Sequence, residues 1–148
     1  MAHSVKRSAL VSFSAEQMFA LVNDIETYPQ YMEGCVGAKI LKREGNWLEA
    51  ELELSKAGVT QRFITRNHLE PPERMTMVLV DGPFKRLEGA WQFTPLAAGA
   101  CKVSFELEFE LQNKLMGFAV GKLFEGVAGK QVEALCTRAA QVYKSTAP

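Results

Sequence analysis

The sequence predicts an α+β fold: seven antiparallel strands in one sheet, two short helices after the first strand, and a long helix at the C-terminal end. Between residues 36 and 111, apolar and polar residues alternate in segments separated by short turns. This alternation is typical of antiparallel strands with one buried and one solvated face. Between residues 113 and 143, apolar residues recur every three or four positions, as in an amphipathic helix. The chain of 148 residues has no internal repeat and no linker, so we expect one domain over residues 1–148.

The N-terminal part predicts a strand followed by two short helices. Residues 4–11 form the strand. Ser14 and Gln17 have the spacing of a capping box, in which the side chain of each residue accepts a hydrogen bond from the backbone N–H of the other. Asp24 can begin a second helix, which should end just before Pro29 because the residue ahead of a proline avoids the helical conformation.

Six further strands follow the two helices. Their predicted ranges are 36–44, 46–54, 59–70, 74–82, 86–96 and 101–111. In the last of them, Phe105, Leu107 and Phe109 face one way, whereas Glu106 and Glu108 face the other. Short turns join all six strands, which indicates a meander.

The C-terminal helix contains four glycines in its first half, Gly117, Gly121, Gly126 and Gly129. Each costs about 1 kcal/mol relative to alanine in a helix interior. Two explanations stay open. Close packing on the sheet or a bend can require the glycines, or this half of the helix is a mobile lid that leaves room for a ligand.

Composition excludes several classes of protein. Seventeen Lys and Arg balance seventeen Asp and Glu, so bulk charge does not favour DNA as a partner. Cys35, Cys101 and Cys136 are widely spaced, which favours reduced thiols in a cytoplasmic protein over a zinc site or a disulfide scaffold. The N-terminal residues lack the pattern of a signal peptide, and no apolar run reaches 18 residues, so we expect neither a signal peptide nor a membrane span.

Candidate catalytic residues are few. The two histidines are His3, expected in a loose terminus, and His68, expected exposed at a strand end. No nucleophile elbow, phosphate-binding loop or dinucleotide fingerprint is present. Gln61, Thr65 and Asp81 share the parity of inward-facing residues and are weak candidates for a general acid. We therefore expect no catalytic site, no metal and no cofactor.

Apolar residues that face inward by parity predict either a solid core or a ligand cavity between the sheet and the C-terminal helix. From the sheet these are Phe63, Met77, Leu79, Trp91, Phe93, Phe105 and Leu107, and from the helix Met116, Ala119, Val120, Leu123 and Phe124. Pockets for apolar ligands have walls of this kind with few polar groups. Methionines suit an irregular ligand because their side chains are flexible.

A small basic cluster is predicted on the outer surface. It comprises Arg62, Arg66, Lys85 and Arg86, with Phe84 in the turn beside them. The simplest interpretation is a solvated face whose charges are balanced. The alternatives are contact with anionic lipid headgroups, with Phe84 as an anchor, or contact with ribosomal RNA phosphates.

Four strings of sequence resemble a known family. They are DIETYPQYMEGCVGAKIL, DGPFKRLEGAWQF, CKVSFELEFEL and TRAAQVY. Together with the order of elements, they are similar to the polyketide cyclase/dehydrase-like branch of the START-related superfamily. Within that branch they resemble the group shared by the coenzyme Q-binding protein and the bacterial ribosome association toxin. The resemblance covers nearly the whole chain.

The resemblance implies a helix-grip fold, in which a curved sheet wraps around the C-terminal helix and leaves a hydrophobic tunnel. It implies non-catalytic binding of ubiquinone or a related polyprenyl quinone in support of respiratory electron transport. The partners would then be respiratory complexes or the surface of the inner membrane. One alternative is a toxin of a toxin–antitoxin pair that binds the large ribosomal subunit and blocks subunit association. A second alternative is an aromatic cyclase or dehydrase.

Overall fold

The computed structural model describes residues 2–112 and 114–143. Its elements, in chain order, are β1 (Ala2–Val11), α1 (Ala15–Asn23), the 3₁₀ helix η1 (Ile25–Gln30), β2 (Cys35–Glu44), β3 (Trp47–Lys56), β4 (Val59–Glu70), β5 (Arg74–Asp81), β6 (Phe84–Ala97), β7 (Ala100–Leu111), α2 (Lys114–Ala128) and α3 (Gln131–Val142). The strands form one antiparallel sheet in the order β1-β7-β6-β5-β4-β3-β2. The predicted fold class is confirmed.

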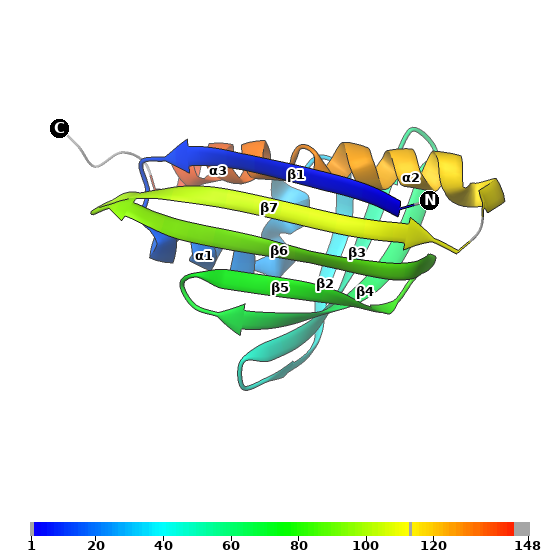
Figure 1. Cartoon of the computed structure of the whole chain (residues 1–148), viewed down its shortest axis with the longest axis horizontal. Helices are drawn as coiled ribbons and strands as arrows, with labels where there is room; N and C mark the ends of the chain where they lie inside the picture. The colour runs from blue at the N-terminus through cyan, green and yellow to red at the C-terminus, as the bar shows by residue number, and fades with distance from the viewer. Residues whose placement is uncertain (1, 113, 144–148) are drawn as a thin grey trace.

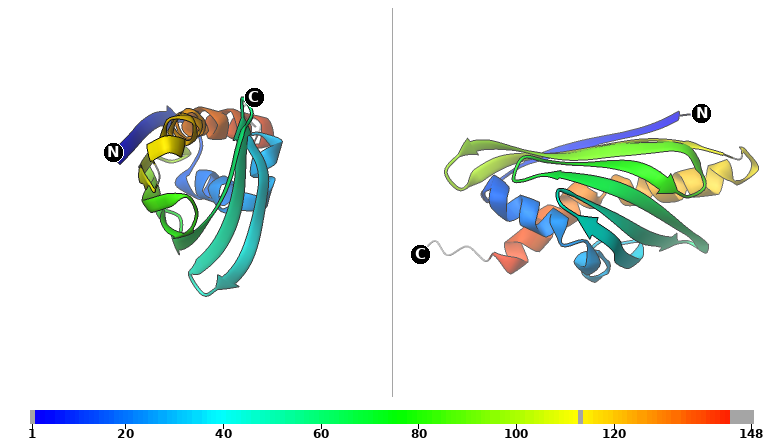
Figure 2. Two further views of the ribbon diagram at one scale, coloured as in Figure 1. Left: turned by 90° about the vertical axis from the view of Figure 1, so that its right-hand side faces the viewer. Right: turned by 90° about the horizontal axis from the view of Figure 1, so that it is seen from below.

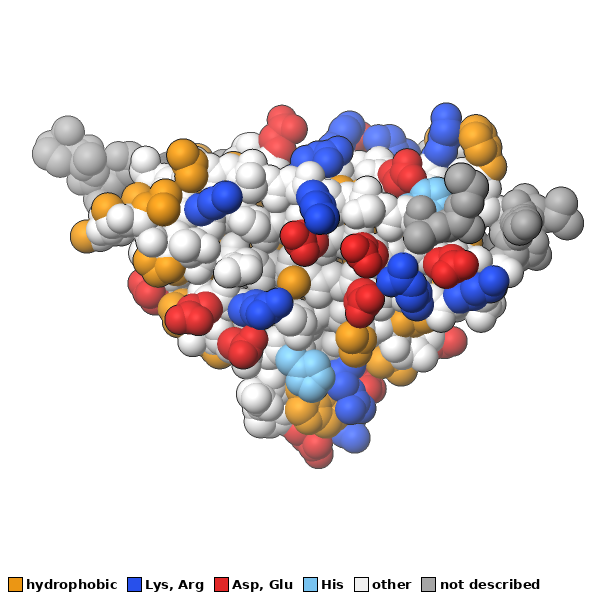
Figure 3. Space-filling view, in the orientation of Figure 1, with side chains coloured by type: hydrophobic (Ala, Val, Ile, Leu, Met, Phe, Trp, Pro, Cys, Tyr) orange, Lys and Arg blue, Asp and Glu red, His pale blue; other side chains and the backbone are white. Residues whose placement is uncertain are grey.

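The sheet curves, and all the helices lie on its concave side (Figures 1 and 2). β1 and β2 are the two edge strands of the sheet. α2 and α3 lie in the concave space between these two edges (Figure 2). The alternating residues of β7 show why this layering follows from the sequence. Val103, Phe105 and Phe109 are buried under the helices, whereas the glutamates between them face solvent among Lys and Arg side chains (Figure 3).

The capping box at the start of α1 is confirmed. The Ser14 hydroxyl accepts a hydrogen bond from the Gln17 backbone N–H at 3.1 Å, and the Gln17 side chain accepts one from the Ser14 N–H at 2.9 Å. The predicted end of the next helix is wrong, because η1 continues through Pro29 to Gln30. A proline near the end of so short a 3₁₀ helix removes a single donor, which leaves the flanking hydrogen bonds in place.

The single long helix expected over residues 113–143 is two helices, and the chain bends between them at Gly129 and Lys130. A side chain at Gly129 would lie 3.2 Å from the Arg7 guanidinium, and one at Gly121 would lie 3.2 Å from the His3 ring. These two positions therefore agree with close packing and a bend as the reason for glycine. Gly126 has open space around it, so the lid explanation for that part of α2 stays a prediction.

His3 corrects another expectation, because it lies in β1 rather than in a loose terminus. Its ring stacks on Phe109 with centroids 4.8 Å apart, and its Nδ1 contacts the Glu125 carboxylate of α2. The register of β1 against β7 places His3 directly opposite Phe109, which brings the imidazole under α2. This contact ties the edge strand to the helix. The three cysteines are free thiols, with Cys35 and Cys101 buried and Cys136 half-buried.

Replacing Ser14 tests the local control of this architecture. Ser14→Ala removes the acceptor for the Gln17 N–H, and we expect it to lower the free energy of unfolding by about 1 kcal/mol. Urea denaturation monitored by circular dichroism measures this loss. Ser12→Ala changes the same atoms at an exposed site and should have little effect. Equal stability of the two variants would show that the cap does not stabilise α1.

Candidate functional site

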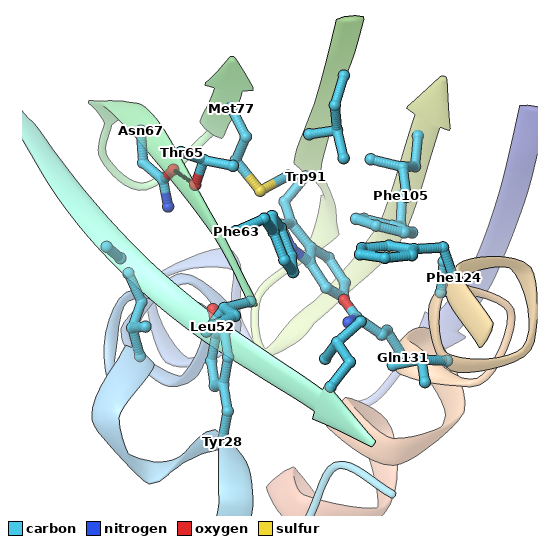
Figure 4. A pocket seen from close by; sticks show the side chains of 17 residues that line it. Tyr28, Leu52, Phe63, Thr65, Asn67, Met77, Trp91, Phe105, Phe124 and Gln131 are labelled. Carbon is cyan, nitrogen blue, oxygen red and sulfur yellow. Dashed lines mark hydrogen bonds between the residues drawn. The ribbon is translucent and has the colours of Figure 1, made fainter. Parts of the chain in front are cut away.

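An apolar cavity lies between the concave face of the sheet and the helices (Figure 4). Its walls are Ile25 and Tyr28 of η1; Ala50, Leu52, Leu54, Phe63, Thr65, Asn67, Met77, Leu87, Trp91, Phe105 and Leu107 of the sheet; and Phe124, Val127, Ala128 and Gln131 of α2 and α3. Leu52, Phe63, Met77 and Gln131 are partly exposed, whereas the other wall residues are buried. The cavity therefore has a closed interior and a rim that approaches solvent.

Half of the twelve ligand-binding residues predicted from the sequence line this cavity. Six of the predicted residues line the cavity, namely Phe63, Met77, Trp91, Phe105, Leu107 and Phe124. Phe93, Val120 and Leu123 are buried in the surrounding core, and Leu79 is half-buried outside the cavity. The side chain of Met116 lies outside the described residues.

Ala119 is a correction, because it is exposed on α2 instead of facing the sheet. The buried positions of this helix are Val120, Leu123, Phe124 and Val127. They follow the three- and four-residue spacing of one helix face, and Ala119 falls beside that face. The exposed aromatic ring of Phe118, with a relative accessibility of 76%, lies on the same solvent side.

The residues that sequence reasoning missed come mostly from β3 and from the helices. Ala50, Leu52 and Leu54 had the right parity, but the alternation alone does not say which part of a sheet face remains uncovered. Tyr28 carried no signal of this kind, because η1 reaches the cavity only through the tertiary fold. Tyr28 donates its hydroxyl hydrogen to the Val22 carbonyl.

Two buried polar side chains interrupt the apolar wall, and Gln131 is a further polar residue at the rim. Thr65 and Asn67 of β4 are 5% and 4% exposed. The Thr65 hydroxyl donates to the Asn67 side-chain oxygen at 2.7 Å, and the Asn67 amide nitrogen donates to the Met75 sulfur at 3.6 Å. Asn67 was not predicted as a site residue, although it shares the parity of Phe63 and Thr65.

The cavity is small in this structure. Its volume is about 50 Å³, whereas an apolar cavity of about 150 Å³ is needed to hold one benzene molecule. A ring-bearing ligand therefore fits only if wall side chains or α2 move outward. Met77, with its flexible partly exposed thioether, is the wall residue best suited to such movement.

The family model described as polyketide cyclase / dehydrase and lipid transport matches residues 11–136. The chain belongs to this family. Within it, the ribosome association toxin RatA of Vibrio cholerae serotype O1 is 50% identical over 139 residues, covering 94% of this chain and 96% of that protein. RatA of Escherichia coli K12 is 46% identical over 141 residues, covering 95% and 89%.

More distant matches carry other names. The mitochondrial coenzyme Q-binding protein COQ10 homolog B of Xenopus laevis is 29% identical, and the match covers 92% of this chain and 57% of that protein. A solved START superfamily protein from Mycobacterium smegmatis has a TM-score of 0.79 at 27% identity, covering 95% and 99%. The Zhui aromatase/cyclase of Streptomyces, with a TM-score of 0.83 at 15% identity and 99% coverage of both chains, shares the fold alone.

The groups considered for the cyclase chemistry of the family are not brought together in this chain. Thr65 lines the cavity, but Gln61 does not. Asp81 is exposed, because a register shift between Ile64 and Thr65 pairs it with the outward-facing Ile64. Tyr28 is the one titratable residue in the described wall, and burial raises the pKa of its phenol, with smaller contributions from Tyr31, Cys35 and Asp24.

The described residues contain no metal-binding cluster and no membrane-spanning helix. Their His, Cys, Asp and Glu side chains form no group of three that could hold an ion. None of the helices in the same part of the chain combines the length and the apolar character needed to cross a bilayer.

The four basic residues of the predicted surface cluster each contact a glutamate on the outer face of the sheet. The pairs are Arg62 with Glu53 at 3.2 Å, Arg66 with Glu49 at 2.7 Å, Lys85 with Glu110 at 3.9 Å, and Arg86 with Glu88 at 3.1 Å. Positive and negative side chains accordingly alternate over this face (Figure 3). The balanced face is therefore the interpretation that the structure favours.

Phe84 corrects the expectation of a surface anchor, because only 2% of it is exposed. Its ring packs edge-on against Phe124 of α2 at 4.7 Å and against Phe109 of β7 at 5.8 Å. A register shift between Phe84 and Arg86 at the start of β6 turns the ring inward. The parity of the strand alone does not reveal this turn.

Truncation of Phe84 distinguishes a core residue from an anchor. We expect Phe84→Ala to lower the free energy of unfolding by about 3–5 kcal/mol, because it removes a buried aromatic ring. Lys85→Ala, at an exposed side chain, should change it by no more than about 0.5 kcal/mol. Guanidinium denaturation measures both. A Phe84→Ala protein of unchanged stability would contradict this assignment.

Proposed function

We propose that the chain is a non-catalytic binding protein for an apolar lipid, ubiquinone or a related polyprenyl quinone, held in the cavity between the sheet and the C-terminal helices. The observation that carries the proposal is the wall of aliphatic and aromatic side chains, in which the buried polar groups besides Tyr28 are Thr65 and Asn67, with Gln131 at the rim. Ligand sites for mainly apolar molecules have this composition. The name of the coenzyme Q-binding relative supports the quinone class.

The chemistry of the wall supports binding without catalysis. A catalyst needs an acid, base or nucleophile near the reacting atoms. The one titratable residue of the described wall, Tyr28, donates a hydrogen bond to the Val22 carbonyl, and burial disfavours its ionised form. The chain in this proposal carries a quinone for respiratory electron transport and does not transform it.

Ligand entry requires the cavity to widen. The partly exposed residues of the rim, Leu52, Phe63, Met77 and Gln131, are the ones whose displacement would connect the interior to solvent. α2 closes one side of the cavity through Phe124, and its glycines make it the helix most easily moved. We therefore expect ligand binding to change the position of α2 and to leave the sheet in place.

Filling the cavity tests the proposal. Ala50 is 2% exposed and lines the interior, so Ala50→Leu places three more carbon atoms in the ligand space at a cost of about 1–3 kcal/mol. We expect this variant to lose binding of decylubiquinone, a short-tailed quinone, in isothermal titration calorimetry. The wild-type protein should bind it with a negative heat-capacity change.

Ala119→Leu is the matched control, because it adds the same atoms on the exposed side of α2. It should bind decylubiquinone as the wild-type protein does. Two negative results together would overturn the proposal. The wild-type protein would take up no quinone, and an organic extract of the protein purified from its natural host would contain no lipid. Unchanged binding by Ala50→Leu would place the ligand elsewhere.

Ribosome association is the second candidate, and the similarity to proteins named ribosome association toxin RatA favours it. In this function the chain would bind the large ribosomal subunit and block subunit joining. Contact with RNA phosphates would make the binding weaken as salt rises. The ion pairs that engage Arg62 and Arg66 would have to open or to take part in that contact.

Sedimentation with purified large subunits tests this candidate. It predicts that the wild-type protein cosediments at low salt and that an Arg62→Glu, Arg66→Glu variant does not. A Lys6→Glu, Lys102→Glu variant carries the same change of charge on exposed positions of β1 and β7 and controls for net charge. Wild-type protein that stays in the supernatant at low salt would exclude the candidate.

A further inference from the structure

Thr65 and Asn67 form a buried polar pair in a part of the sheet face that is otherwise apolar. Tyrosine apart, they are the polar side chains that are buried among the described residues, and both line the cavity. The neighbouring inward positions of the same strand, Phe63 and Leu69, are apolar. Burying an amide and a hydroxyl is unfavourable unless their hydrogen bonds are satisfied. A pair of this kind in an otherwise apolar wall indicates recognition of a polar atom.

The orientation of the Asn67 amide is fixed by its two neighbours. Thr65 donates to the Asn67 side-chain oxygen at 2.7 Å, and the amide nitrogen faces the Met75 sulfur at 3.6 Å. The reversed orientation would set the amide oxygen against a thioether, which accepts but does not donate. The cavity wall therefore carries an amide N–H₂ group whose present partner is a weak acceptor.

We infer that Asn67, oriented by Thr65, donates a hydrogen bond to an acceptor oxygen of the ligand, so that the cavity takes a carbonyl-bearing ring in preference to its hydroxyl form. This inference deepens the proposed function and rests on it. A quinone carbonyl only accepts hydrogen bonds, and it would replace the poor acceptor Met75. A quinol hydroxyl also brings a donor, which would have to share the Asn67 oxygen with Thr65. A hydrocarbon of the same shape leaves the amide nitrogen with its weak partner.

The inference also gives the ligand a direction. Asn67 and Thr65 are buried, and of the partly exposed rim residues Met77 pairs with Asn67 across β4 and β5. Figure 4 shows Asn67 and Gln131 on opposite sides of Phe63. With the ring at Asn67, the polyprenyl tail would extend past Phe63 toward Gln131.

The test compares three ligands with the same ten-carbon tail: decylubiquinone, decylubiquinol under reducing conditions, and decylbenzene, which has no oxygen. We expect the wild-type protein to bind the quinone about tenfold more tightly than the quinol, a difference of about 1.4 kcal/mol. We expect Asn67→Leu, which keeps a similar volume, to lose this preference and to bind decylbenzene at least as well. Thr65→Val frees the amide to rotate and should lose part of the preference.

Infrared difference spectroscopy reports the hydrogen bond itself. Binding to the wild-type protein should lower the C=O stretching frequency of the quinone, and Asn67→Leu should abolish that shift. An unshifted carbonyl in the wild-type complex, or equal affinity for quinone and quinol, would overturn the inference without any variant having to fold. Wild-type protein that binds neither decylubiquinone nor decylbenzene would instead overturn the proposed function.

Discussion

The ring of Phe124 packs edge-on against Phe84 and Phe63, with centroids 4.7 and 5.0 Å apart, and lies 5.8 Å from Phe109. This contact is the constraint on which the C-terminal half of the structure depends. α2 is rich in glycine, so its own propensity contributes little and its position must come from packing. The same ring forms a wall of the cavity. The interaction that holds the helix on the sheet is therefore also the one that closes the ligand space.

That double role links the small cavity to its proposed function. A ligand that pushes Phe124 aside loosens α2, and the apolar surface of the ligand replaces the lost contacts. The sheet, in contrast, is held by continuous antiparallel pairing from β1 to β2. Proteins that share this fold carry names as different as ribosome association toxin and aromatase/cyclase, so function has to be argued from the site and not from the fold. Here the residues inside the cavity can bind a carbonyl but offer no titratable group apart from Tyr28 in the part of the wall that is described.

Much of the fold could be predicted from the sequence because local patterns determine it. The alternation in β3 and β7 and the capping box at Ser14 depend only on neighbours along the chain, and the strand bounds agree with the predicted ranges to within two residues. The inward turn of Phe84 and the exposure of Asp81 could not be predicted, since each follows from a register shift between strands. A Cβ at Gly129 would lie 3.2 Å from the Arg7 guanidinium of β1, a neighbour that the sequence around the bend does not reveal.

The site was predicted in part for the same reason. Strand parity identifies which residues face inward, and six of the twelve predicted ligand residues line the cavity. Parity does not show where the helices leave the sheet face uncovered, so Ala50 and Leu52 were missed. Parity selected Thr65 only as a weak candidate acid, and Asn67 at the same parity was missed. The local sequence does not show that either side chain is buried.

The central claim is that a quinone binds in the cavity between the sheet and the helices and not on the outer face of the sheet. The two tryptophans can test it. Trp91 is 2% exposed and lines the cavity, whereas Trp47 lies on the outer face with Arg66 4.1 Å from its ring. In a Trp47→Phe protein, the account predicts saturable quenching of Trp91 fluorescence by decylubiquinone. In a Trp91→Phe protein, it predicts only weak, non-saturating quenching of Trp47. Saturable quenching of Trp47, or none of Trp91, would contradict the account.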